Sequence, residues 1–84
     1  MSDKKVTIYT TPACVYCRTA KDFFTKHGVE YEEYDVLSDV EKREEMVKKS
    51  GQLGAPVIVV AEPGGREEVI LGFDQPRLTA LLGL

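Results

Sequence analysis

The two cysteines, Cys14 and Cys17, are the residues of this sequence best suited to chemistry. No other cysteine occurs in the 84 residues, and the two stand three positions apart. A disulfide that closes so short a loop would constrain the unfolded chain by only about 2 kcal/mol, so stapling the fold explains it poorly. Small secreted scaffolds instead spread about four to eight cysteines along the chain. The pair therefore indicates redox chemistry or metal binding.

The residues around the pair predict a strand that leads into a helix. Residues 6–10 are β-branched and aromatic, residues 11–13 interrupt the strand, and a helical pattern begins at Cys14. Backbone N–H groups without partners and the positive end of the dipole at a helix start stabilise a thiolate. An ordinary cysteine is only about 3% thiolate at pH 7, and this position raises that fraction. We therefore expect Cys14 to be an exposed nucleophile and Cys17, one turn further along, a partly buried resolving thiol.

A metal site is the main alternative reading of the pair. A closed zinc site needs four ligands, and the sequence offers only one further soft ligand, His27. His27 would lie roughly 15 Å from Cys17 along the same helix. We expect it to be a surface residue near the helix end. We therefore expect no metal within one chain. An iron–sulfur cluster that bridges two chains through Cys14 remains an alternative.

The elements that must position the pair follow the order βαβαββα. The expected strands cover residues 6–10, 29–36, 56–60 and 68–71. A capping box at Ser38 predicts the start of the second helix, whose apolar face would be Val40, Met46 and Val47. The last helix is expected to begin at Asp74 or Gln75.

These elements predict one domain, residues 1–84, of the α/β class. Strands joined through a helix pair in parallel, whereas the final hairpin must be antiparallel. The prediction is therefore a four-stranded mixed sheet flanked by three helices.

Composition and charge exclude several classes of function. At 43% hydrophobic the chain is too apolar to be disordered. Its longest apolar run, residues 55–61, is far shorter than the ~20 residues that span a bilayer, and no apolar leader follows Met1. A net charge of −3 without an aromatic and basic stripe argues against nucleic-acid binding. We therefore expect a cytoplasmic protein without membrane or nucleic-acid partners.

Three segments resemble the motifs of glutaredoxins. Residues 9–17 are similar to their active-site segment, Gly54-Ala55-Pro56-Val57 resembles their Thr-Val-Pro loop, and Gly72-Phe73-Asp74 falls where they have a Gly-Gly-x-Asp-Asp turn. The resemblance implies a thioredoxin-like fold, the reduction of glutathione mixed disulfides, and a cis Pro56 that faces the cysteines. The backbone of Ala55 would then pair with glutathione as an added strand does. The substrate-binding residues that it implies are Thr11, Pro12, Tyr16, Ala55, Pro56, Gly72, Phe73 and Asp74.

The sequence departs from the glutaredoxin pattern at three places. Val15 replaces the usual proline of Cys-Pro-Tyr-Cys, Thr11 replaces a lysine, and Phe73 is bulkier than the residue it replaces. Val15, Gly72 and Phe73 also resemble the small redoxins that donate electrons to ribonucleotide reductase and are recycled by thioredoxin reductase. That branch usually has glutamine where Tyr16 stands, so the sequence lies between the two groups.

The sequence therefore predicts a monomeric thiol–disulfide oxidoreductase that acts on protein or glutathione mixed disulfides. We expect no tightly bound cofactor, with glutathione as a co-substrate. The expected partners are disulfide-containing proteins and either glutathione or thioredoxin reductase. The alternatives are an electron donor for ribonucleotide reductase or a peroxidase, a cluster-bridging dimer, and, least favoured, an interaction module without enzymatic activity.

Overall fold

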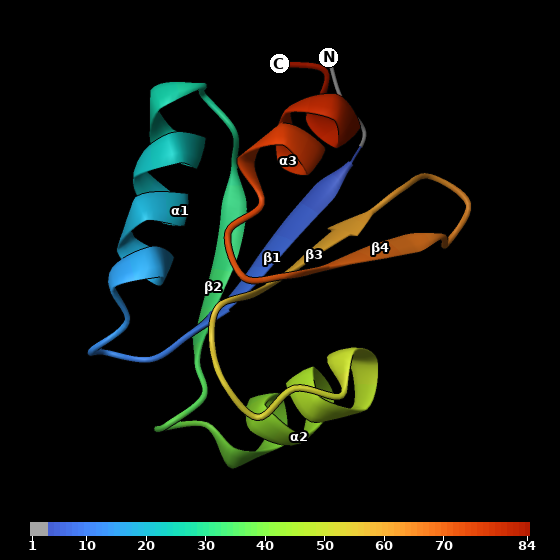
Figure 1. Cartoon of the computed structure of the whole chain (residues 1–84). Helices are drawn as coiled ribbons and strands as arrows, with labels where there is room; N and C mark the ends of the chain where they lie inside the picture. The colour runs from blue at the N-terminus through green and yellow to red at the C-terminus, as the bar shows by residue number, and fades with distance from the viewer. Residues whose placement is uncertain (1–3) are drawn as a thin grey trace.

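The computed structural model describes residues 4–84, and these form the elements in the predicted order (Figure 1). The strands are β1 (Lys5–Thr10), β2 (Tyr31–Asp35), β3 (Val57–Ala61) and β4 (Glu67–Leu71). The helices are α1 (Val15–Lys26), α2 (Val40–Ser50) and α3 (Gln75–Leu82). Among these residues, no helix combines the length and the apolar character needed to cross a membrane.

The strands form one mixed sheet in the order β2-β1-β3-β4. β1 pairs in parallel with β2, whereas β3 pairs antiparallel with both β1 and β4. β1 and β3 are thus the central strands, and β3 is buried from Val57 to Val60 because helices cover both of its faces. This arrangement confirms the predicted mixed sheet.

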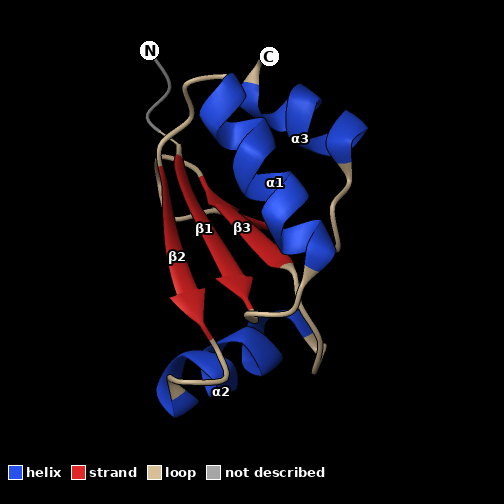
Figure 2. Cartoon of the chain, turned by 90° about the vertical axis from the view of Figure 1, so that its left-hand side faces the viewer, coloured by secondary structure: helices blue, strands red, loops and turns tan. Residues whose placement is uncertain are grey.

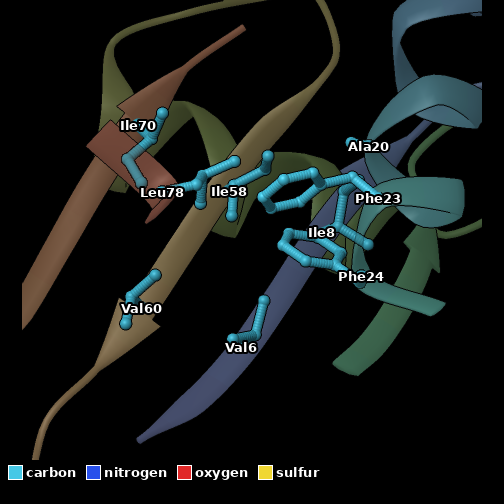
Figure 3. Close-up of a cluster of buried hydrophobic side chains, with 9 residues drawn as sticks. All are labelled: Val6, Ile8, Ala20, Phe23, Phe24, Ile58, Val60, Ile70 and Leu78. Carbon is cyan, nitrogen blue, oxygen red and sulfur yellow. The ribbon is translucent and has the colours of Figure 1, made fainter. Parts of the chain in front are cut away.

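Helices α1 and α3 cover one face of the sheet and α2 covers the other (Figure 2). Because side chains alternate along a strand, β1 and β3 contribute to a hydrophobic cluster on each face. Figure 3 shows the cluster beneath α1 and α3, whose buried members are Val6, Ile8, Ala20, Phe23, Phe24, Ile58, Val60, Ile70 and Leu78. The cluster beneath α2 is smaller and consists of Tyr9, Val36, Met46, Val57 and Val59.

Strand β2 is shorter than the predicted strand over residues 29–36. Tyr31 packs against the α1 face, with its ring 5.4 Å from that of Phe24, and Tyr34 packs on the α2 face, 6.0 Å from Tyr9. Two aromatic residues three positions apart therefore lie on opposite faces of an edge strand. For this reason, apolar and polar residues do not alternate regularly along the sequence of β2.

The predicted start of α2 is wrong by one residue. Asp39 is the N-cap, and its carboxylate accepts the Lys42 N–H at 3.1 Å. The Ser38 hydroxyl donates instead to the carboxylate of Asp35, within the turn that follows β2. Val40 is also 66% exposed, so the buried side of α2 is narrower than predicted and centres on Met46.

Candidate active site

Cys14 occupies the junction between β1 and α1, as the sequence predicts. It is the N-cap of α1, with extended backbone angles of −87° and 112°, and its Sγ accepts the N–H of Cys17 at 3.0 Å. The Cys14 N–H donates to the carbonyl of Thr11 at 3.2 Å, which closes the turn between strand and helix. Cys14 and Cys17 form a disulfide, with their Cα atoms 5.2 Å apart. The sulfur of Cys14 therefore already has a hydrogen-bond donor that would stabilise a thiolate.

The two sulfur-bearing side chains differ in exposure. Cys17 is 2% exposed, because it lies on the same buried side of α1 as Ala20 and Phe24. Cys14 is half-buried, and the two residues between the cysteines, Val15 and Tyr16, are 73% and 67% exposed. Of the two sulfurs, that of Cys14 is thus the accessible one, and an exposed apolar pair lies next to it.

An open recess of about 190 Å³ lies beside the disulfide. Its lining residues come from β1, the following turn, α1 and β2, and are Thr10, Thr11, Pro12, Cys14, Cys17, Arg18, Lys21, Glu33 and Asp35. Two predicted binding residues, Thr11 and Pro12, therefore share this recess with the cysteines. The four charged residues of the recess were not predicted from the sequence.

A hydrogen-bonded group of three side chains lies within this recess. The Thr10 hydroxyl and the Lys21 ammonium both donate to Oε2 of Glu33, each at 2.9 Å. The hydrogen bond from Lys21 is the main reason that the pKa of Glu33 lies below its usual value, with a further contribution from Thr10. Glu33 is therefore a carboxylate at neutral pH. The sequence holds one signal that Lys21 lies near the pair, since Lys21 follows Cys17 by one helical turn.

The segment containing Ala55 and Pro56 meets the segment before α3. The Ala55–Pro56 peptide is cis, as the resemblance implied, and Pro56 is buried while Ala55 is half-buried. The Gly72 N–H donates to the carbonyl of Pro56 at 2.9 Å, which joins these two predicted binding segments. Neither segment contributes to the lining of the recess. Their contact with a substrate stays a prediction.

Phe73 and Asp74 have structural partners of their own. The ring of Phe73 packs edge-on against Phe23 at 5.5 Å, so it contributes to the cluster beneath α1 and α3. Asp74 is the N-cap of α3, as predicted, and its carboxylate accepts the Arg77 N–H at 3.2 Å. Both side chains therefore help to fix the start of α3.

His27 lies at the far end of α1 from the disulfide. It is the exposed C-cap residue, and its ring lies 4.6 Å from that of Phe23. This position confirms the expectation of a surface histidine at the helix end. Within residues 4–84, no group of three or more His, Cys, Asp or Glu side chains is arranged to hold a metal ion.

The Cys14–Cys17 disulfide lies at the start of the first helix, beside a mixed sheet of strand order β2-β1-β3-β4. This arrangement is that of a thiol redox protein with the thioredoxin-like fold. The chain belongs to the glutaredoxin family, whose sequence model matches residues 6–63. Glutaredoxin 3 of Escherichia coli is 40% identical over 55 residues, which are 66% of each chain. A glutaredoxin-like 8.6 kDa protein from the rubredoxin operon of Clostridium pasteurianum is 30% identical over 77 residues, 92% of this chain and 96% of that one. The structure of a glutaredoxin from Archaeoglobus fulgidus has the same fold, with a TM-score of 0.78 at 21% identity over 95% of this chain and 87% of that one.

Proposed function

We propose that the protein is a thiol–disulfide oxidoreductase that reduces mixed disulfides of proteins or of glutathione. The observation that carries this proposal is the placement of Cys14. Its sulfur is accessible, stands at the N-terminus of α1, accepts a backbone N–H, and is bonded to the buried sulfur of Cys17. Such a position favours the thiolate, which is the form that attacks disulfides.

The reaction would begin with the reduced pair. The Cys14 thiolate attacks one sulfur of a substrate disulfide, forms a mixed disulfide and releases the other substrate sulfur as a thiolate, which takes a proton from water. Cys17 then loses its proton to solvent, and its thiolate attacks the Cys14 sulfur. This step forms the Cys14–Cys17 disulfide and releases the second substrate sulfur as a thiolate, which takes a proton from water. Two electrons have then passed from the protein to the substrate.

The surroundings of Cys14 suit an extended substrate segment. Val15 and Tyr16 present apolar surface beside the sulfur, and the Thr11–Pro12 turn forms one wall of the adjoining recess. The backbone of Ala55, a half-buried residue, would pair with the substrate as an added strand does. With glutathione as co-substrate, the mixed disulfide on Cys14 would be released by a second glutathione or by Cys17. We further propose that the protein acts as a monomer in the cytoplasm.

A coupled assay tests the proposal and identifies the reductant. NADPH oxidation is followed with a disulfide substrate, in one arm with glutathione and glutathione reductase, and in the other with thioredoxin reductase alone. Turnover in the first arm supports a glutathione-dependent enzyme, and turnover only in the second supports an electron-donor redoxin. Cys14→Ser should abolish turnover in both arms. If the Cys14→Ser variant kept full activity, the proposed function would be wrong.

The roles of the two cysteines are separated by Cys17→Ser. This variant keeps the attacking thiolate and loses the resolving thiol, so it should accumulate a mixed disulfide of Cys14, which mass spectrometry detects. With glutathione present, it should retain part of its activity on glutathione mixed disulfides. Accumulation of a mixed disulfide on Cys17 in the Cys14→Ser variant instead would reverse the assignment.

A further inference from the structure

A lysine–glutamate pair lies beside the disulfide, and the reaction above does not use it. Lys21 lies on α1 one turn beyond Cys17, and Glu33 lies on β2, opposite Ile8 of β1. Because Ile8 faces the helix α1 side of the sheet, so does its strand partner Glu33. The parallel pairing of β1 with β2 therefore carries a carboxylate to the helix that bears the cysteines.

The carboxylate of Glu33 is held in place from two sides. Lys21 donates to Oε2 from the helix, and the Thr10 hydroxyl donates to the same oxygen from the sheet, each at 2.9 Å. Thr10 is only 3% exposed, so its hydroxyl meets the carboxylate from the protein interior, and the Tyr34 carbonyl is a more distant second acceptor at 3.5 Å. The side chains of Lys21 and Glu33 are 32% and 37% exposed, which leaves their charges only partly screened by water.

Four charged residues line the recess beside the disulfide. Arg18 and Lys21 project from α1, whereas Glu33 and Asp35 project from β2. The Asp35 carboxylate accepts hydrogen bonds from the turn that follows β2, and Arg18 is exposed. Lys21 and Glu33 are the two opposite charges of the recess that are bonded directly to each other.

Reduction of the disulfide creates a negative charge beside this pair. The disulfide takes up two electrons and, near neutral pH, one proton, and becomes one thiolate and one thiol. An ammonium nearby stabilises the thiolate and a carboxylate destabilises it. A more stable thiolate stabilises the reduced form, and so raises the reduction potential.

We propose that Glu33, held by Thr10, is a positioning residue that restrains the Lys21 ammonium and partly neutralises its charge. Glu33 thereby keeps the reduction potential of the Cys14–Cys17 pair lower than Lys21 alone would make it. The proposal rests on the proposed function, because it concerns the potential at which that dithiol donates electrons. It assigns a tuning role to Lys21 and Glu33, neither of which takes part in the bond changes of the reaction above.

The test measures two properties of the dithiol in a set of variants. Absorbance at 240 nm against pH gives the pKa of the Cys14 thiol in the reduced protein. Equilibration in redox buffers of dithiothreitol gives the reduction potential of the pair. Neither measurement requires a substrate protein or a reductase. Circular dichroism shows that each variant is folded.

Removing the negative charge of the pair and removing its positive charge should shift the pKa and the potential in opposite directions. Glu33→Gln leaves Lys21 without its counter-charge, so the pKa of Cys14 should fall and the dithiol–disulfide equilibrium constant should shift about threefold toward the dithiol, or about +14 mV. Lys21→Gln should raise the pKa and shift the constant about threefold toward the disulfide. Lys21→Arg keeps the charge and should restore values close to those of the wild type. The double variant should also lie near the wild type, because both charges are removed together.

The chain contains a matched control pair. Lys49 and Glu67 also join a helix to a strand, with 3.0 Å between Nζ and Oε2 and side chains 32% and 39% exposed, but they do not line the recess. Lys49→Gln and Glu67→Gln should leave both the pKa and the potential unchanged. The proposal is overturned if Glu33→Gln and Lys21→Gln shift the potential in the same direction, or by no more than these control variants. Failure of the proposed function would instead be seen as full reductase activity of Cys14→Ser, a result independent of the potentials.

Discussion

The attachment of α2 to the sheet depends chiefly on Met46. Its side chain is fully buried beneath the helix, whereas Val40 on the same helix is 66% exposed. Met46→Ala removes the Cγ, Sδ and Cε atoms and leaves a cavity between α2 and the central strands. Such substitutions cost about 2–5 kcal/mol in protein cores, and we expect a loss of about 3 kcal/mol in the free energy of unfolding. For a domain of this size, about 3 kcal/mol lowers the midpoint of thermal unfolding by roughly 12–24 °C.

The assay is urea unfolding of the oxidised protein at pH 7, followed by circular dichroism, with Val40→Ala as the matched control. Val40→Ala removes an exposed side chain from the same helix and should change the free energy of unfolding by less than about 0.5 kcal/mol. Because α2 lies on the face opposite α1, the folded Met46→Ala protein should keep its disulfide-reductase activity at 20 °C. Equal losses in the two variants, or a loss below about 1 kcal/mol for Met46→Ala, would refute the packing that we describe.

Four further substitutions test local features of the fold. Asp39→Ala should lower the free energy of unfolding by about 1 kcal/mol because it removes the N-cap of α2, whereas Ser38→Ala should change it by less than about 0.5 kcal/mol; urea titration decides between the two caps. The buried Tyr9 hydroxyl donates to Glu45, and this hydrogen bond is the main reason that the pKa of Glu45 lies below its usual value. A carboxyl with a lowered pKa in the folded state stabilises the fold above its unfolded pKa and loses that contribution as the pH falls. Tyr9→Phe should therefore cost about 1–2 kcal/mol at pH 7 and clearly less at pH 3, and an equal cost at both values would contradict this account. Gly72→Ala places a Cβ at φ of +76° with no atom within 4 Å, so its cost should be the backbone cost of about 1 kcal/mol, measured by thermal unfolding.

The elements that the sequence predicted well carry strong local signals. The apolar run of β3, the β-branched residues of β1 and the Asp74 cap of α3 each depend on a few neighbouring residues, and the structure places all three as expected. The cap of α2 was predicted wrongly because Ser38 and Asp39 are both good acceptors. The choice between them depends on Asp35, whose carboxylate takes the Ser38 hydroxyl into the preceding turn.

The residues of the candidate site likewise differ in whether local sequence signals predict them. The spacing of Cys14 and Cys17 and the strand-to-helix junction are local, so the accessible and buried thiols could be predicted from the pattern alone. For the charged part of the recess, the sequence indicates only that Lys21 follows Cys17 by one helical turn, and it does not indicate the contact of Lys21 with Glu33. Lys21 and Glu33 are 12 positions apart, and nothing in the sequence between them indicates contact. They meet because β2 pairs with β1 in a register that places Glu33 opposite Ile8, beneath α1.

The redox pair, its place at the start of a helix and the order of the elements can all be read from the sequence, because each depends on interactions between residues close along the chain. The surroundings of that pair depend instead on how distant segments pack. Strand register brought the Thr10, Lys21 and Glu33 side chains together, and packing directed the ring of Phe73 toward Phe23. Such contacts join residues distant in sequence, and their geometry exists only once the sheet has formed.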